Sequence, residues 1–252
     1  MGNQNSTNRA FNRTESSTYD LTRFLTDSTH CAVVFADHES DRSEPIPARW
    51  KEIWNNAPVR YCVDRGADRI VHDHKLNDTR LPTKICGKLD RMNAETRAFL
   101  EGKESLLEET YDEEECTVKM LVKAQLGEID TVVLLGGCAG RFDRLLANLD
   151  SLFQANTLFP VPTVALHGNN VLTVLPEGDL AIKVDRMMLT GMCGFAPIAQ
   201  AKTVVTTRGF KWNLENTEMK FGTKISTSNE LNSDLLEVKT TAPLVLTVEL
   251  QE

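Results

Sequence analysis

Apolar residues gather in short, nearly continuous runs through the first two thirds of the chain. The clearest are CAVVFA at 31–36, VRYCVD at 59–64, TVVLLGG at 131–137 and TVALH at 163–167, with a shorter run in TKICGKLD at 83–90. Runs of this length, rich in valine and bounded by turn residues, predict strands that are buried on both faces.

Between these runs the apolar positions recur at helical spacing. In the segment 47–56, Trp50, Ile53 and Trp54 fall on one helical face. After Phe142 the apolar residues repeat at i, i+3, i+4 and i+7, namely at Leu145, Leu146, Leu149, Leu152 and Phe153. We also expect helices at 94–102 and 116–127. Buried strands that alternate with amphipathic helices predict a parallel sheet covered on both faces.

The pattern changes to period two after about residue 169. In the segment 243–250 four apolar residues alternate with the residues between them: Leu244, Leu246, Val248 and Leu250. This alternation predicts antiparallel strands with one buried face, and Pro-Glu-Gly-Asp at 176–179 predicts a hairpin turn. We therefore expect a flexible polar tail (1–29), a three-layer α/β domain (30–168) and an all-β sandwich domain (169–252).

Composition excludes some classes of protein. The 252 residues are 41% hydrophobic and 25% charged, with a formal net charge of −8 and no basic stripe, which argues against a nucleic-acid partner. No apolar run approaches the roughly 20 residues of a transmembrane segment. The six cysteines are widely spaced, which favours core thiols in a reducing, cytoplasmic compartment over a disulfide framework or zinc site.

The polar N-terminus contains a candidate modification site. Gly2 and Ser6 fit the myristoylation pattern, which would give a weak, reversible membrane tether, and the alternative is an unmodified polar tail.

The segment LLGGCAGRFDRLL at 134–146 carries the most informative turn. Gly137 and Gly140 follow a predicted strand, and Arg141 and Asp143 stand where a helix begins. Ligands of parallel sheets bind beyond the carboxyl ends of the strands, and a helix N-terminus favours anions. The turn is therefore a candidate phosphate site, although a tight structural turn explains the glycines equally well.

Acidic residues are expected at the same edge of the sheet. Asp64, Asp90, Asp143 and the acidic run 112–115 follow predicted strands or precede helices. Converging carboxylates need a counter-cation, and Mg²⁺ with nucleotide phosphates is the usual one. The alternative is that each acid caps a helix or keeps the surface soluble.

Two long motifs resemble those of eukaryotic thiamine pyrophosphokinases. GGCAGRFDRLLANLDSLFQA resembles that family's Gly-Gly-x-x-Gly-Arg-Phe-Asp signature and the helix after it. VTTRGFKWNLENTEMKFGTKISTSN resembles its β-domain stretch, and CVDRGADRI and MCGFAPIAQ resemble two shorter motifs. The resemblance covers nearly the whole ordered length and implies a nucleotide-binding catalytic domain at 30–168, a thiamine-binding β-sandwich at 169–252, and a homodimer with the site at the subunit interface.

The resemblance also implies a reaction and its residues. Thiamine's hydroxyl attacks the β-phosphorus of ATP, with Mg²⁺, and gives thiamine diphosphate and AMP. Matched to the family, the residues fall into four groups: Asp64, Asp90, Asp143 and Lys119 are catalytic; Gly137, Gly140, Arg141 and Lys88 bind phosphate; Trp212, Ser226, Ser228 and Asn229 bind thiamine; and Asp90, Asp112 and Glu114 bind metal. Trp212 suits the thiazolium because an aromatic face attracts a cation, whereas its alternative role is a core aromatic residue.

The departures from the family pattern lie in the nucleotide and metal half. The family's Gly-Asp-x-Asp-Ser reads here Gly87-Lys88-Leu89-Asp90-Arg91, and Asp112, Glu114 and Lys119 match the acidic motif only approximately. A charged lysine cannot bind Mg²⁺. Two hypotheses follow: an active thiamine pyrophosphokinase with a remodelled metal site, which we favour, or an impaired relative that binds thiamine or nucleotide as a sensor or partner protein.

Overall fold

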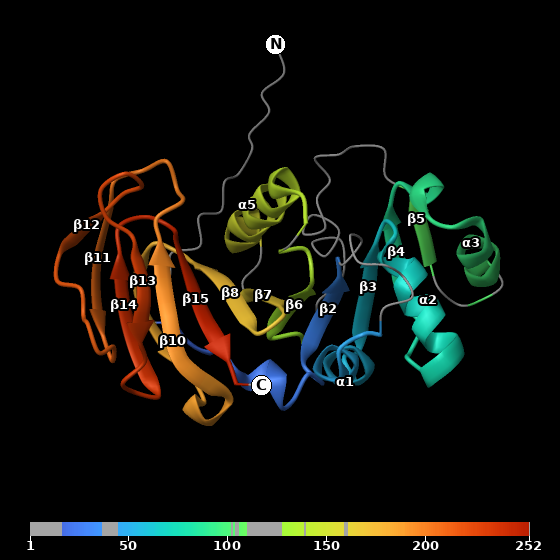
Figure 1. The fold of residues 1–252 in the computed structure, drawn as a ribbon, viewed down its shortest axis with the longest axis horizontal. Helices are drawn as coiled ribbons and strands as arrows, with labels where there is room; N and C mark the ends of the chain where they lie inside the picture. Colours follow the sequence, from blue (N-terminus) through green and yellow to red (C-terminus); the bar gives the residue numbers. More distant parts are fainter. Residues whose placement is uncertain are drawn as a thin grey trace, which may run out of the picture.

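A ten-stranded sheet runs through the whole molecule (Figure 1). The computed structural model describes residues 17–36, 45–101, 103, 106–109, 128–138, 140–158 and 161–251. One half of the sheet is parallel, in the order β7 (Thr163–His167), β6 (Thr131–Leu135), β2 (Cys31–Phe35), β3 (Val59–Val63), β4 (Lys84–Gly87) and β5 (Leu106–Glu109). The other half is antiparallel and continues from β7 through β8 (Asn170–Leu175), β15 (Leu244–Leu250), β10 (Leu189–Ala196) and β13 (Ser226–Glu230).

A second, five-stranded sheet lies beside the antiparallel half of the ten-stranded sheet and completes the sandwich, on the left of Figure 1. Its order is β1 (Ser17–Asp20), β9 (Gly178–Lys183), β14 (Leu235–Thr240), β11 (Thr203–Arg208) and β12 (Thr217–Met219). The α/β region followed by a β-sandwich confirms the fold class expected from the sequence. The expected boundary after residue 168 falls in the turn between β7 and β8, which pair with each other, so the sheet is continuous across it.

Helices cover the parallel half of the sheet. They are α1 (Ala48–Asn56), α2 (Gly66–Asn77), α3 (Ala94–Glu101) and α5 (Phe142–Leu158), with short 3₁₀ turns η1 (Arg23–Leu25), η2 (Leu89–Arg91) and η3 (Arg186–Met188). In α1 the predicted face is buried: Trp50, Ile53 and Trp54. In α5 Leu149 and Leu152 are buried, whereas Leu146 stays 45% exposed.

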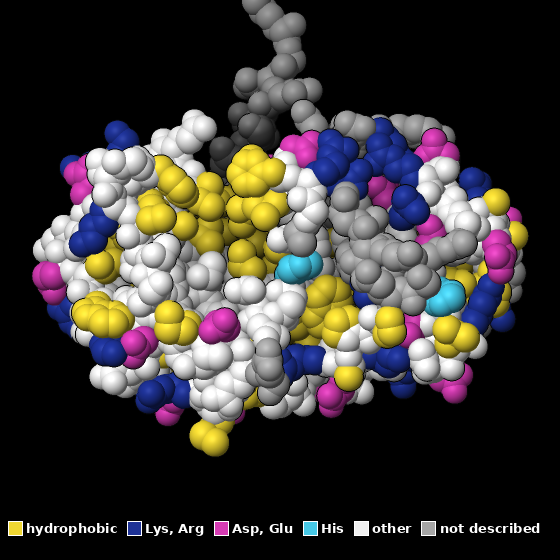
Figure 2. Space-filling view, in the orientation of Figure 1, with side chains coloured by type: hydrophobic (Ala, Val, Ile, Leu, Met, Phe, Trp, Pro, Cys, Tyr) yellow, Lys and Arg dark blue, Asp and Glu magenta, His cyan; other side chains and the backbone are white. Residues whose placement is uncertain are grey.

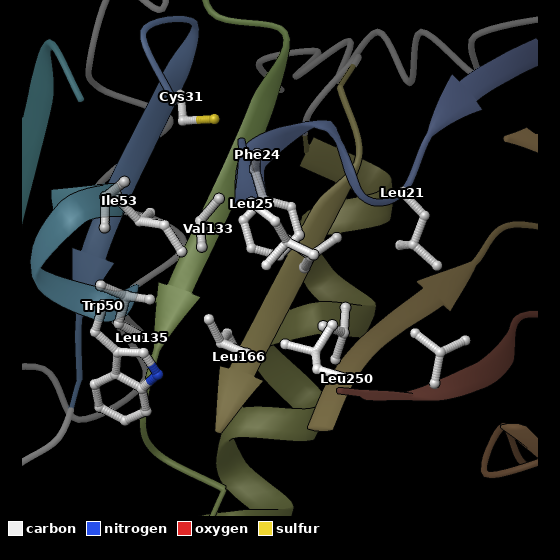
Figure 3. Packing of buried hydrophobic residues seen from close by; sticks show 14 of the residues in the cluster. Leu21, Phe24, Leu25, Cys31, Trp50, Ile53, Val133, Leu135, Leu166 and Leu250 are labelled. Carbon is white, nitrogen blue, oxygen red and sulfur yellow. The ribbon is translucent and has the colours of Figure 1, made fainter. Parts of the chain in front are cut away.

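The main core runs from α1 to the interior of the sandwich. Figure 3 shows Trp50 and Ile53 of α1 packed beside Val133, Leu135 and neighbouring strands of the sheet. A smaller core lies on the opposite face of the parallel strands, under α5. As predicted, the described cysteines are mostly core thiols, because four of five are buried, and burial raises the pKa of the Cys31 thiol to about 12.

Residues 17–29 do not form part of a flexible tail, which corrects the expectation for 1–29. Strand β1 pairs in parallel with β9, and Leu21, Phe24 and Leu25 are buried. Asp20 accepts hydrogen bonds from the backbone N–H groups of Thr22 and Arg23 and so begins η1.

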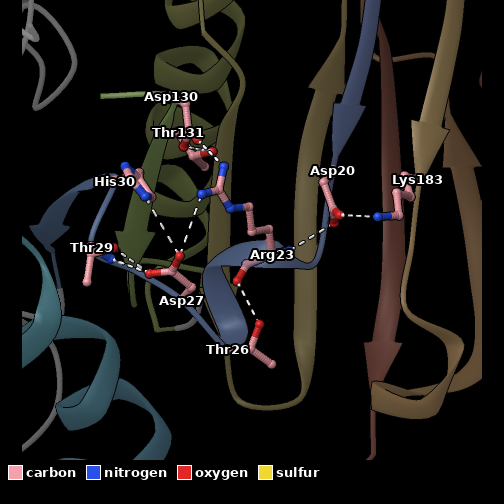
Figure 4. Close-up of polar contacts among 9 residues, drawn as sticks. All are labelled: Asp20, Arg23, Thr26, Asp27, Thr29, His30, Asp130, Thr131 and Lys183. Carbon is pink, nitrogen blue, oxygen red and sulfur yellow. Dashed lines mark hydrogen bonds and ion pairs between the residues drawn. The ribbon is translucent and has the colours of Figure 1, made fainter. Parts of the chain in front are cut away.

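An ion pair fastens this segment to the parallel sheet (Figure 4). Arg23 lies 2.6 Å from Asp130, which directly precedes β6, and 3.5 Å from Asp27. The segment therefore links the five-stranded sheet to the parallel half of the ten-stranded sheet.

The hairpin expected at 176–179 is also wrong. Strand β8 belongs to the ten-stranded sheet and β9 to the five-stranded sheet, so the turn carries the chain between sheets. Gly178 makes this change with a φ of 125°. Helix α2 and strand β5 were not expected, and the helix predicted at 116–127 lies outside the described residues.

Candidate active site

The carboxyl ends of the parallel strands bring three of the predicted segments to one edge of the sheet. Asp64 follows β3, Lys88 follows β4, and the glycine turn 136–140 follows β6 and leads into α5. Because β6, β2, β3 and β4 are neighbours in that order, these segments lie along the same rim, at the top of Figure 1. The topology therefore supplies the arrangement that a phosphate-bearing ligand needs.

Asp64 is held in a strained and well-defined position. Its φ is 46°, a left-handed conformation that non-glycine residues rarely adopt. Its Oδ1 accepts a 2.7 Å hydrogen bond from the backbone N–H of Lys88, and its Oδ2 lies 3.3 Å from Nη1 of Arg91. A Cβ atom on Gly87 would lie 2.0 Å from the same Oδ1. The carboxylate is therefore packed directly against the start of the Gly87–Arg91 segment.

Arg91 brings a positive charge to this carboxylate where the family pattern has a serine. The guanidinium is 43% exposed and the Asp64 side chain 18% exposed. Asp90, between Lys88 and Arg91 on η2, is exposed. The structure therefore brings Asp64, Lys88 and Arg91 together and leaves Asp90 on the open side of the turn.

A buried acid that the sequence did not single out supports this segment. Asp68 of α2 is 4% exposed and accepts hydrogen bonds from the backbone N–H of Asn93 at 3.0 and 3.3 Å. It fixes the chain between η2 and α3. The pattern gave no signal for it, because its partner is a backbone group 25 residues away.

The glycine turn adopts a conformation that requires glycine. Gly136, Gly137 and Gly140 have φ values of 84°, 78° and 84°. The side-chain amide of Asn148, in the second turn of α5, donates a hydrogen bond to the carbonyl of Gly137. A Cβ atom on Gly137 would lie 2.6 Å from the nitrogen of that amide. The turn is thus fixed by its own helix.

Arg141 and Asp143 form an ion pair at the beginning of α5. Arg141 donates from Nε and Nη2 to the two carboxylate oxygens at 3.1 and 2.5 Å, and both side chains are more than 60% exposed. The hydrogen bond from Arg141 holds the pKa of Asp143 below its usual value. A phosphate at the helix N-terminus could accept the same guanidinium hydrogen bonds.

Basic side chains gather on the rim beside this turn. Figure 2 shows Lys and Arg side chains gathered at the top of the view, in the same orientation as Figure 1. Exposed arginines that follow the strands contribute at Arg65, Arg91 and Arg141, which are 43–63% exposed. Although the chain is acidic overall, this edge can attract an anion.

The described residues do not by themselves form a metal site. They contain no group of three or more His, Cys, Asp or Glu side chains arranged to hold an ion. Asp64 offers hard oxygen atoms, but these face the Lys88 N–H and Arg91. Asp112, Glu114, Lys119 and Gly2 lie outside the described residues.

Trp212 lies at the tip of a loop that the sandwich anchors on both sides. The ring is 53% exposed, whereas Phe210 and Leu214 are buried at 2% and 7%, and Phe210 packs edge-on against Phe195. The exposure excludes the alternative of a core aromatic residue. Lys211 Nζ lies 4.6 Å from the ring centroid, so the ring contacts a cation of the chain itself.

The Asn229 side chain holds the Trp212 backbone, a role that the sequence did not predict. Its side chain is buried, its Oδ1 accepts from the backbone N–H of Trp212 at 3.3 Å, and its Nδ2 donates to the Trp212 carbonyl at 3.0 Å. The amide thus clamps the backbone of Trp212, a contact between positions 17 residues apart.

Ser226 and Ser228 line a cavity of about 350 Å³ on the sheet face formed by β13, β10 and β15. A second cavity, of about 200 Å³, is lined by Cys138 of the glycine turn, Leu145 and Leu149 of α5, and His167. Both cavities are lined by Asn170 and Thr247, so they adjoin each other. Hydrophobic side chains are visible between α5 and the sandwich in Figure 2. Adjacent cavities therefore lead from the glycine turn to the two serines, and neither includes Trp212.

Comparison with known proteins matches both halves of the chain. Residues 50–161 match the family model "Thiamin pyrophosphokinase, catalytic domain", and residues 179–245 match "Thiamin pyrophosphokinase, vitamin B1 binding domain". Thiamin pyrophosphokinase 1 of Caenorhabditis elegans is 30% identical over 209 residues, covering 82% of this chain and 85% of the relative. The thiamine pyrophosphokinase of Saccharomyces cerevisiae is 26% identical, covering 82% of each chain.

Solved structures share the fold. Thiamin pyrophosphokinase from Candida albicans superposes with a TM-score of 0.79 at 16% identity, covering 94% of both chains. The yeast enzyme gives a TM-score of 0.76 at 18% identity, covering 93% of this chain and 91% of the other.

Among the residues that the structure describes, no helix is long and apolar enough to cross a membrane.

Proposed function

This chain belongs to the thiamin pyrophosphokinase family, and from that premise we propose that it transfers the pyrophosphoryl group of ATP to the hydroxyl of thiamine. The proposal rests on the match of both the catalytic and the vitamin B1-binding models to this chain, and on a curated relative that aligns over 85% of its own length. An impaired relative acting as a sensor or partner protein is not favoured.

The reaction is a displacement at the β-phosphorus. The hydroxyl oxygen of thiamine forms a bond to this phosphorus, the bond from it to the oxygen bridging the α- and β-phosphorus breaks, and AMP leaves with that oxygen. We assign the phosphate contacts to Arg141, Lys88 and the backbone N–H groups around Gly137 and Gly140. The glycine conformations and the exposed guanidinium support this assignment, because cationic and N–H donors stabilise the charge of transferring phosphates.

The proton of the attacking hydroxyl needs an acceptor. Asp64, Asp90 and Asp143 are the candidates among the described residues, and Lys119 remains a catalytic candidate outside them. Asp64 is the best defined, because two donors fix the direction of its carboxylate. In the presence of ATP, Arg141 can turn from Asp143 to a phosphate, which would free that carboxylate.

We place thiamine on the sandwich side of the site. Trp212 would stack on the charged thiazolium ring, and Ser226 and Ser228 would bind the aminopyrimidine from the larger cavity. Asn229 would act on thiamine mainly through its hold on the Trp212 backbone. Because Trp212 lies outside both cavities, a second subunit in the proposed homodimer could complete the site.

The remaining features are also proposals. Mg²⁺ is the divalent metal that suits ATP, with Asp90, Asp112 and Glu114 as its ligands. We propose a cytoplasmic enzyme, with Gly2 as an acylation site. The mass of the intact protein from a eukaryotic host tests the last point, since a mature chain without added acyl mass contradicts it.

The Arg141–Asp143 pair provides the test of the proposed site. Arg141→Ala and Asp143→Asn should each lower turnover at least about tenfold while the melting temperature changes little, because both side chains are exposed. Lys239 and Asp179 form a comparable pair, both 66% exposed, on β14 and β9, and Lys239→Ala and Asp179→Asn serve as controls. Equal activity in all four variants would show that the glycine turn has only a structural role.

A further inference from the structure

The ammonium of Lys211 occupies a complete cation site on the surface of the sandwich. It lies 4.6 Å from the centroid of the Trp212 ring, and the two carboxylate oxygens of Glu230 each lie 2.8 Å from it. The backbone N–H of Lys211 also donates to the Glu230 carbonyl at 2.8 Å. One positive charge therefore has an aromatic face and a carboxylate as its partners.

The backbone that carries the aromatic face and the carboxylate is held by the sandwich. The Trp212 backbone is bound by the Asn229 amide, and Glu230 is the last residue of β13 and the direct neighbour of Asn229. The Lys211 stem has four rotatable bonds, and its side chain is 50% exposed. The ammonium can therefore leave to water while the backbone of its two partners stays in place.

We propose that the Glu230 carboxylate, beside the Trp212 face already assigned to thiamine, is the counter-ion of the positively charged ring of the substrate, and that Lys211 is an internal occupant displaced when this ring binds. The inference rests on the proposed function, because it takes thiamine as the ligand. Replacing one cation by another keeps Glu230 neutralised throughout, so the exchange is electrostatically balanced. A neutral ring of the same shape would leave the carboxylate without its partner, so the subsite selects for a permanent positive charge.

Lys211 and Glu230 should have opposite effects on thiamine binding. Lys211 competes with the ligand, so its removal strengthens binding. Glu230 is the counter-ion of the ligand, so its removal weakens binding. A loop that merely positions Trp212 would not produce effects of opposite sign, nor effects that depend on the charge of the ligand.

The test measures affinity by calorimetry for thiamine and for its neutral isostere, in which a thiophene replaces the thiazolium. We compare the wild-type chain with Lys211→Met, which keeps a long apolar stem, with Glu230→Gln in that background, and with Trp212→Ala. Lys211→Met should bind thiamine about two- to fivefold more tightly, as expected for loss of an exposed cation–π competitor. Adding Glu230→Gln should weaken thiamine binding by a similar factor and leave binding of the neutral isostere unchanged.

A melting curve for each variant shows whether it is folded, and the exposure of both side chains predicts that it is. The inference is overturned if Lys211→Met leaves thiamine affinity unchanged or weakens it, or if Glu230→Gln affects both ligands equally. In those cases a loss of thiamine affinity in Trp212→Ala, together with product formation by the wild-type chain, would still support the proposed function. Absence of thiamine binding and of product in the wild-type chain would instead overturn the proposed function, and the inference with it.

Discussion

Gly87→Ala should damage catalysis by displacing one carboxylate. The added Cβ would lie 2.0 Å from Oδ1 of Asp64, a distance that non-bonded atoms cannot keep, and 3.2 Å from its backbone nitrogen, which is a tight contact. The Asp64 side chain must therefore move, which breaks its 2.7 Å hydrogen bond from the Lys88 N–H and its contact with Arg91. The φ of Gly87 is 113°, so alanine also strains the backbone.

A matched control separates the effect of the clash with Asp64 from the effect of the backbone strain at Gly87. Gly178 has a φ of 125° and nothing within 4 Å of its would-be Cβ, so Gly178→Ala introduces the backbone strain alone. That strain is about 1–3 kcal/mol in either variant. Gly87→Ala should lose about 1.5–3 kcal/mol more, the usual contribution of a hydrogen bond to a charged group. For a chain of this size the additional loss lowers the melting temperature by about 3–12 °C.

Thermal unfolding and turnover of the folded fraction are measured for both variants. We expect Gly178→Ala to keep its specific activity, because Gly178 is the first residue of β9 in the five-stranded sheet of the sandwich. We expect Gly87→Ala to lose most of its activity well below its melting temperature. Equal specific activities would show that the position of Asp64 does not matter for the reaction, and equal stabilities would contradict the predicted clash.

Two further predictions concern charge. Lys88→Asp should lower the Mg²⁺ concentration needed for half-maximal rate, because it adds an oxygen ligand where the family has one. Mg²⁺ titrations of the activity of the wild-type chain and of the variant measure this. Loss of activity in the variant would instead show that Lys88 binds phosphate. Asp73 is buried, which raises the pKa of its carboxyl, but hydrogen bonds from Thr79, Lys51 and Asn77 outweigh burial and hold that pKa below 3.8. The stabilisation from the ionised Asp73 carboxylate is therefore complete above about pH 4 and is lost as the pH falls below that value. Asp73→Asn should lower the unfolding free energy at pH 7 by about 1–3 kcal/mol and make that free energy decline less steeply in acid. Urea unfolding at a series of pH values measures both effects.

Sequence patterns predicted the elements whose burial is decided locally. Strands β2 and β6 are continuous apolar runs, and the face of α1 carries its two tryptophans at helical spacing. The same patterns placed Asp64, Asp90 and the glycine turn at one edge, because parallel strands bring their carboxyl ends together.

The errors concern partners far away in the chain. Only Leu21, Phe24 and Leu25 signal order in the polar segment before residue 30, and β1 finds its partner strand about 160 residues later. The composition of the turn at 176–179 specifies a change of direction but not which sheet each strand joins. The clamp of Asn229 on Trp212 and the pairing of Arg91 with Asp64 likewise depend on tertiary contacts that spacing does not contain.

Identification of the reaction products decides whether the chain transfers a pyrophosphoryl group to thiamine. Purified full-length protein is incubated with ATP, Mg²⁺ and thiamine, and the nucleotides and thiamine esters are separated and quantified over time. We expect AMP and thiamine diphosphate in equal amounts, both dependent on thiamine, because the attack is at the β-phosphorus. Formation of ADP with thiamine monophosphate, or no thiamine-dependent product at all, would contradict it.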